Sequence, residues 1–191
     1  MNAFRSVILA FLLGFAAASA GFLFYYEFLP YSAPQGGVCA YRIMPLFSPD
    51  SQDSFVQAVG SAEKTLDVML YQFSNPAMQE ELAKAVERGV VVRVILEPRV
   101  DSNYATAETL SQNGIQVKWA SREYTNTHSK TAVVDGRKII VGSTNWSKQA
   151  MRSNRESTVL IDSEELAKEF LAVFEEDWVK AKEYAEGSSN G

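Results

Sequence analysis

The chain alternates between short apolar runs and stretches in which apolar residues recur every three or four positions. Apolar runs typical of strands occupy residues 40–47, 65–73, 90–96 and 115–120. Helical spacing predicts helices over 53–62, from Asn75-Pro76 to Gly89, and over 104–112. Asn is a favoured N-cap, Pro fits the first helical turn and Gly suits a helix end. Strands that alternate with helices predict a largely parallel sheet with helices on its faces.

The pattern changes after residue 120. Strands are expected at 129–134 and 138–141, on either side of Asp135-Gly136, which is a strong hairpin-turn signal. Another strand covers 157–161, and a last helix begins at Ser163 with two glutamates in its first turn. Its core-facing side is predicted by the four-residue spacing of Leu166, Phe170, Phe174 and Trp178. The predicted fold class is α/β (α+β), with a central mixed β-sheet flanked by helices on both faces.

A longer apolar run lies near the N-terminus. Ser6 to Tyr26 is 21 residues without a charge, which matches the roughly 20 residues that cross a bilayer as a helix. Arg5 precedes the run, so the positive-inside rule places the folded domain outside the cytoplasm. Ala18-Ser19-Ala20 also resembles a signal-peptidase site, and a secreted or periplasmic product is the alternative. The predicted organisation is a signal anchor or signal peptide (1–27), a linker (28–39), a folded domain (40–186) and a flexible tail (187–191).

Composition limits the chemistry that this chain can perform. One cysteine, Cys39, and one histidine, His128, exclude an internal disulfide and a cysteine-based zinc site. No metal or cofactor is predicted, and a site of carboxylates alone has no spacing signal to support it. The net charge is −5, yet the segment from Lys118 to Arg155 carries eight basic and two acidic residues, or +6. A positive segment suits an anionic substrate such as a phosphate ester, although a solvated basic surface would give the same pattern.

The segment 127–147, THSKTAVVDGRKIIVGSTNWS, combines several groups suited to phosphate chemistry. His128 and Lys130 lie two residues apart in a strand, so they project to the same face. An imidazole beside an ammonium is costly unless an anion lies between them, and a phosphate would supply that anion. The hairpin should return Ser143 and Asn145 beside His128 as hydrogen-bonding groups for phosphate oxygens. A surface pair or a turn would explain each feature alone, whereas their combination favours a site.

The spacing of these residues resembles the HKD motif of the phospholipase D superfamily, and it reads His128-x-Lys130-(x)4-Asp135-(x)6-Gly142-Ser143-x-Asn145. The resemblance covers Ala40 to Trp178. It is greatest to small members with one motif, the secreted Nuc-type bacterial endonucleases and the membrane-anchored mitochondrial relatives. It implies the phospholipase D/nuclease fold and a metal-independent phosphodiesterase. In such enzymes one histidine attacks phosphorus to form a phosphohistidine, and a second histidine protonates the leaving oxygen and then activates water.

The resemblance also implies roles for individual residues. The implied site residues are His128, Lys130, Asp135, Glu156, Ser143 and Asn145. Lys130, Ser143 and Asn145 would hold the phosphate. Glu156 would orient the nucleophilic imidazole, because a carboxylate on one ring nitrogen fixes the tautomer and supports the developing cation. For Asp135, a role in holding the hairpin is favoured over direct acid–base chemistry.

Larger members of the family carry two motifs in one chain, whereas this chain has one histidine. An obligate homodimer with a shared active site would supply the second His128 across a two-fold axis. The favoured substrate is DNA or RNA, because the positive segment suits a polyanion. A phospholipid is the alternative, since an anchor would hold the site near a lipid surface. A non-enzymatic anchored binding protein is a third possibility, but it predicts a broken motif, and every matching position is intact.

Overall fold

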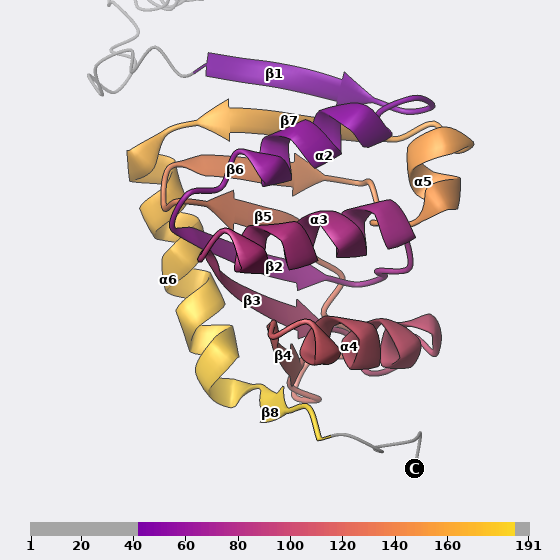
Figure 1. Ribbon diagram of the computed structural model, residues 1–191, viewed down its shortest axis with the longest axis vertical. Coiled ribbons are helices and arrows are strands. Elements are labelled where there is room, and N and C mark those ends of the chain that lie inside the picture. The colour runs from indigo at the N-terminus through magenta and orange to yellow at the C-terminus, as the bar shows by residue number, and fades with distance from the viewer. Residues whose placement is uncertain (1–41, 186–191) are drawn as a thin grey trace, which may run out of the picture. The chain divides into compact units, whose positions relative to one another are not determined.

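The computed structural model describes residues 42–185, which form an eight-stranded mixed sheet with helices on both faces (Figure 1). The strands are β1 Arg42–Phe47, β2 Thr65–Leu70, β3 Val91–Leu96, β4 Gln116–Trp119, β5 Lys130–Val134, β6 Lys138–Gly142, β7 Ser157–Asp162 and β8 Lys182–Glu183. The helices are α2 Gln52–Gly60, α3 Pro76–Glu87, α4 Ser102–Gln112, α5 Lys148–Arg152 and α6 Glu164–Lys180.

The predictions for the N-terminal apolar segment, the linker and the C-terminal tail lie outside the described residues. Within residues 42–185, no helix is long and apolar enough to cross a membrane.

The strand order is β1-β7-β6-β5-β2-β3-β4-β8. Only the β2–β3 and β3–β4 pairs are parallel, and the remaining pairs are antiparallel. The prediction of a largely parallel sheet is therefore wrong, whereas the mixed sheet with helices on both faces is confirmed. The error lies in β1, which pairs with β7 at the edge of the sheet. Arg42 and Pro45 suit an edge strand, because a proline has no N–H for a second neighbour and inner parallel strands are apolar on both sides.

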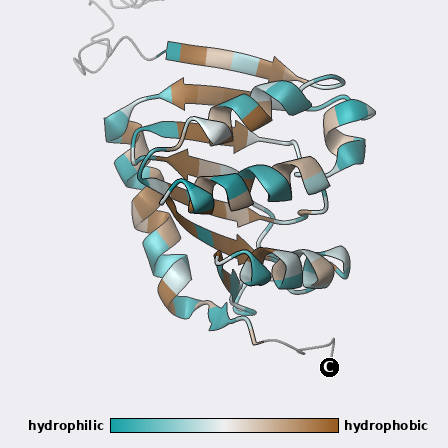
Figure 2. Ribbon diagram, viewed as in Figure 1, coloured by the Kyte–Doolittle hydropathy of each residue, from teal (hydrophilic) through white to brown (hydrophobic). Residues whose placement is uncertain are grey.

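Each face of the sheet packs its own layer of helices. On β2, Leu66, Val68 and Leu70 belong to the main core on one face, and Met69 belongs to a smaller core with Phe174 of α6 on the other. Helices α2, α3 and α4 cover the main core, as seen in front of the sheet in Figure 1. The central strands are largely apolar, whereas the helices carry polar residues as well (Figure 2). The alternation of β2 side chains between the two cores follows from the two-residue period of a strand.

Arg93 of β3 joins the sheet to α6. Its Nε donates to Asp67 Oδ1 at 2.6 Å and its Nη2 to Glu175 Oε1 at 2.6 Å. The guanidinium also lies 4.9 Å from the ring centroid of Phe174 and 5.3 Å from that of Trp178. These contacts confirm the predicted core-facing side of the last helix. Burial raises the pKa of Asp67, although its bonds to Arg93 act in the opposite direction.

The predicted caps are present, and two short elements are absent from the prediction. Asn75 Oδ1 accepts a hydrogen bond from Ala77 N at 3.1 Å, and Gly89 follows α3 with a φ of 90°. The unpredicted elements are the five-residue helix α5 and the two-residue strand β8. Both are too short for a repeating hydrophobic pattern, which needs at least about four residues in a strand and about eleven in a helix, so periodicity could not detect them.

Candidate functional site

The two ends of the β5–β6 hairpin, which carry the predicted site residues, meet at the sheet edge where the parallel strands β2 and β3 end. Tyr71 follows β2, and its N–H donates to Ser129 O at 2.8 Å. Thr131 of β5 is paired with Val141 of β6, so the preceding Lys130 and the following Gly142 lie at the same edge of the sheet. Sites in α/β sheets commonly lie beyond the carboxyl ends of the strands. The hairpin therefore brings its two ends together as predicted.

His128 and Lys130 are in direct contact. Lys130 Nζ lies 3.0 Å from His128 Nδ1 and 3.2 Å from Nε2, and it donates to the carbonyl oxygen of His128 at 2.8 Å. The imidazole is exposed, whereas Lys130 is only 7% exposed. Burial lowers the pKa of Lys130, and the negative charge of Glu156 partly offsets that effect. An anion bound here would stabilise the ammonium, which is the condition for a phosphate site.

Tyr71 is a site residue that the sequence prediction did not include. Its ring centroid lies 4.3 Å from that of His128, with an angle of 54° between the ring planes. Lys130 Nζ lies 5.1 Å from the same ring centroid. The negative face of an aromatic ring favours a nearby cation, so Tyr71 supports the ammonium of Lys130 while its ring packs against His128. Its position directly after a buried strand was the available signal, because such positions face the site edge.

Glu156 is held by neighbours at the start of β7. Its Oε2 accepts from Ser143 Oγ at 2.6 Å and its Oε1 from Asn154 Nδ2 at 2.9 Å. Ser143 Oγ in turn accepts from Ser157 N at 3.1 Å. Among residues 42–185, no hydrogen bond joins Glu156 to His128. The predicted orientation of the imidazole by Glu156 is thus not found within one chain, because Ser143 and Asn154 occupy the carboxylate.

Asn145 has a buried polar atom without a partner. Its Oδ1 is the one buried side-chain nitrogen or oxygen in the described part of the chain that makes no hydrogen bond. A buried polar atom without a partner is costly, so this amide is suited to a hydrogen bond with a bound group. A half-turn of the amide would place its two N–H donors at the same point. The amide could then donate to a phosphate oxygen, and the phosphate-binding role of Asn145 stays a prediction.

The loop that carries Ser143 and Asn145 is fixed by Trp146, which is 1% exposed. Trp146 N donates to Gln72 O at 3.1 Å, and its carbonyl accepts from Ser74 N and Asn75 N at 2.9 and 3.0 Å. These bonds join the end of the hairpin to the loop after β2. The phosphate-binding candidates are thus attached to the rigid core on both sides.

Gly142 allows β6 to pack closely against β7. A Cβ atom at this position would collide with Ser157 O and with the Cα and Oγ1 atoms of Thr158. The clash involves backbone atoms, which cannot move aside as a flexible side chain can. The glycine of the motif is therefore needed for the register that aligns Ser143 with the start of β7.

Asp135 lies at the opposite end of β5 from His128, roughly 20 Å away at the ordinary rise of a strand. Its carboxylate accepts from the backbone N–H groups of Glu63, Lys64 and Thr65 at 2.7 to 3.2 Å. Burial opposes the charge of Asp135, but these three bonds outweigh it and hold its pKa below the ordinary value. Asp135 cannot touch the same phosphate as His128, so its place among the implied site residues is corrected to that of a structural clamp. The favoured role in holding the hairpin agrees with this geometry.

The basic segment predicted as one positive region is divided by the fold. Arg137 pairs with Asp162 at 2.7 Å, at the Asp135 end of the hairpin. Arg155 lies at the His128 end, where its Nη1 donates to Ser48 O at 3.3 Å. The error arises because β6 runs from one end of the hairpin to the other and so separates Arg137 from Arg155. Only part of the +6 segment can therefore act on a substrate at His128.

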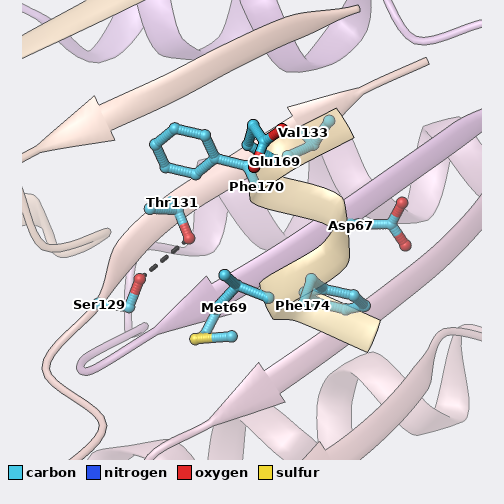
Figure 3. A pocket seen from close by; sticks show the side chains of 9 residues that line it. Asp67, Met69, Ser129, Thr131, Val133, Glu169, Phe170 and Phe174 are labelled. Atoms are coloured by element: carbon cyan, nitrogen blue, oxygen red, sulfur yellow. Dashed lines mark hydrogen bonds between the residues drawn. The ribbon is translucent and has the colours of Figure 1, made fainter. Parts of the chain in front are cut away.

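A mostly apolar pocket of about 300 Å³ lies between α6 and strands β2 and β5 (Figure 3). Its lining includes Met69, Thr131, Val133, Phe170 and Phe174. Side chains alternate along β5, so Lys130 points to the other face of the sheet. The pocket is therefore separate from the phosphate-binding candidates.

Comparison with known proteins yields one family and several curated relatives. The family model described as "Cardiolipin synthase, PLD-like domain" matches residues 55–178. The mitochondrial cardiolipin hydrolase of Canis lupus familiaris is 32% identical over 78% of this chain and 59% of its own. That of Danio rerio is 35% identical over 62% of this chain and 52% of its own. This chain therefore spans between half and two thirds of the length of these relatives.

Solved structures share the fold. A phospholipase D family member, Nuc from Salmonella typhimurium, is 26% identical with a TM-score of 0.73, over 76% of this chain and 99% of the other. NucT from Helicobacter pylori is 16% identical with a TM-score of 0.67, over 75% of this chain and 99% of the other. The second likeness concerns the fold alone.

We expect Asp135→Asn to destabilise the chain in a pH-dependent way. Asparagine tolerates the positive φ of 53° found at this turn, so the substitution removes mainly one acceptor oxygen and the charge. The cost should be about 1 to 2 kcal/mol near neutral pH, measured by urea unfolding. The folded-state pKa lies below the unfolded value near 3.8, so the stabilisation is present above that value and is lost as the pH falls through the folded pKa.

The difference between wild type and Asp135→Asn should therefore shrink on acidification below about pH 4. Asp50→Asn is a matched control, because Asp50 also has a positive φ, of 72°, but its carboxylate accepts no hydrogen bond within residues 42–185. A difference that stays constant down to pH 2 would contradict the clamp.

Proposed function

We propose a function on the premise that this chain belongs to the phospholipase D superfamily. The chain is a phosphodiester hydrolase, and its action requires no metal. The observation that carries this proposal is the contact between the exposed imidazole of His128 and the buried ammonium of Lys130. A nucleophile and a phosphate counter-charge are thereby held at one point of the sheet edge.

The proposed reaction has two steps. A ring nitrogen of His128 bonds to phosphorus, and the bond to the leaving oxygen breaks as a second imidazole gives that oxygen a proton. The second imidazole then takes a proton from water, whose oxygen displaces His128 from phosphorus. Lys130, Ser143 and Asn145 hold the non-bridging oxygens, whose negative charge grows in both transition states.

The second imidazole must come from a second chain, because His128 is the only histidine. We therefore propose a homodimer whose two-fold axis brings both copies of His128 to one site. Glu156 makes no hydrogen bond to His128 within residues 42–185, although its charge acts on Lys130. Its orienting role is therefore proposed across the axis, on the imidazole of the other chain.

Nucleic acid is the proposed substrate. Arg155 flanks the His128 end of the sheet, the likeness to Nuc covers nearly the whole of that protein, and phosphate contacts would bind the backbone without base readout. A phospholipid is the second candidate, because the matched family and the curated relatives carry cardiolipin in their names. A domain anchored to a membrane and facing away from the cytoplasm is proposed for either substrate, with a secreted or periplasmic product as the alternative.

His128→Ala should abolish hydrolysis, because it removes both the nucleophile and the proton donor. The 191-residue chain is assayed on single- and double-stranded DNA, on RNA and on cardiolipin-containing vesicles, which also identifies the substrate class. We expect kcat on the active substrate to fall at least about 1,000-fold. Thr125→Ala, exposed in the same segment, is the control. Hydrolysis by His128→Ala at a rate near that of the control would falsify the role of His128.

Chelation should leave the activity unchanged. Among residues 42–185, no group of three or more His, Cys, Asp or Glu side chains is arranged to hold a metal ion. Initial rates are compared before and after incubation with excess EDTA and dialysis, with and without added Mg²⁺, Mn²⁺ or Zn²⁺. A rate that is lost with EDTA and restored by one of these ions would refute the metal-independent reaction.

Mixed dimers should be inactive if both copies of His128 serve one site. Equal amounts of wild type and His128→Ala are unfolded together and refolded, so that chains pair at random. Activity per total protein should then be about one quarter of the wild-type value, whereas independent sites would give about one half. Sedimentation of the wild-type chain provides the control for its dimeric state, and an active monomer contradicts the shared site.

A further inference from the structure

A buried carboxylate holds the residue that precedes His128. Glu97 directly follows β3 and is 0% exposed. Its Oε2 accepts from Thr127 N at 2.6 Å, and its Oε1 accepts from the backbone N and Nη1 of Arg99 at 3.0 and 2.8 Å. Both oxygens of Glu97 are thus occupied, and one of them holds the backbone next to the imidazole.

Arg99 holds the same segment at a second point. Its Nη2 donates to Tyr124 O at 3.1 Å. Residues 120–129 between β4 and β5 contain no helix or strand, so without such bonds their backbone would have considerable freedom. The Glu97–Arg99 ion pair therefore fixes the segment at both residue 124 and residue 127.

Asn103 connects the backbone of Glu97 to the backbone of Tyr71. Its Nδ2 donates to Glu97 O at 2.9 Å and to Tyr71 O at 2.8 Å, and its Oδ1 accepts from Phe73 N at 2.9 Å. Tyr71 supplies the ring that packs against the imidazole. One network thus holds the backbone before His128 and the backbone of Tyr71, whose ring packs against His128.

We propose that Glu97, together with Arg99, is a positioning residue for His128. Burying the carboxylate of Glu97 costs free energy that its half-buried partner Arg99 offsets only in part, so this pair is a poor device for stability alone. Its directional bonds instead place the segment that carries His128. The proposal rests on the proposed role of His128 as nucleophile.

Glu97→Gln tests this role with little change in size. An amide has one acceptor oxygen, so either Thr127 N–H or Arg99 loses its partner and faces an N–H₂ group. Displacement of a reacting group by about 1 Å can cost about 100-fold in rate. We expect kcat to fall about 10- to 100-fold while KM stays within about threefold, because Lys130, Ser143 and Asn145 lie on the hairpin and are retained.

Asp67→Asn is the matched control. Asp67 is also a buried carboxylate, 4% exposed and 2.6 Å from an arginine nitrogen, but its partner Arg93 joins α6 rather than the segment before His128. Its substitution should lower thermal stability and leave kcat per folded chain near the wild-type value. Arg99→Lys is a second test variant if Glu97→Gln does not fold, because it retains the charge and loses the two-pronged hold on Glu97 and Tyr124.

The single histidine provides a readout that needs no substrate. Proton NMR of the 191-residue chain should give one set of imidazole signals, because the chain has one histidine, and the Tyr71 ring should displace them from their positions in a free peptide. In Glu97→Gln or Arg99→Lys the signals should move toward the free-peptide positions or broaden, whereas Asp67→Asn should retain the wild-type positions.

Unchanged imidazole signals in folded Glu97→Gln and Arg99→Lys would overturn the proposal, as would an equal change in Asp67→Asn. The outcome also separates this proposal from the proposed function. If the wild-type chain hydrolyses none of the substrates, the function is rejected, and the NMR signals still decide whether Glu97 positions His128.

Discussion

The register of the β5–β6 hairpin against β2 is the constraint on which the site depends. Asp135 fixes one end of the hairpin to the start of β2 through the backbone N–H groups of Glu63, Lys64 and Thr65. Ser129 fixes the other end through Tyr71. A slip of one residue would turn Lys130 to the α6 face of the sheet and away from the ring of Tyr71. The two clamps therefore determine on which face of the sheet the Lys130 ammonium lies. No contact within the site could determine this.

Much of the fold could be predicted because its elements are long and periodic. The helix that starts at Asn75, the core-facing side of α6 and the Asp135-Gly136 hairpin all follow from local chemistry. The place of β1 could not be predicted in this way, because strand pairing depends on which edge of the sheet remains free. The same limit applies to the basic segment, since net charge along the sequence does not reveal that the hairpin sends Arg137 and Arg155 to opposite ends.

The site could be predicted in its residues but only partly in its geometry. The contact of His128 with Lys130 follows from their two-residue spacing, whereas Tyr71, Glu97 and Asn103 lie 25 to 57 residues earlier in the chain. Tyr71 and Glu97 directly follow the parallel strands β2 and β3, which marks them as residues at the site edge but does not reveal their contacts. Asn103 lies in α4 and carries no local signal. Glu97 in particular resembles any charged residue after a strand until its complete burial is seen.

The exposure of the only histidine has a consequence for chemical labelling of the chain. A reagent that is selective for imidazole has one target per chain, and that target lies beside Lys130 at the sheet edge. Each labelled imidazole therefore reports one modified site edge, with no other histidine to correct for.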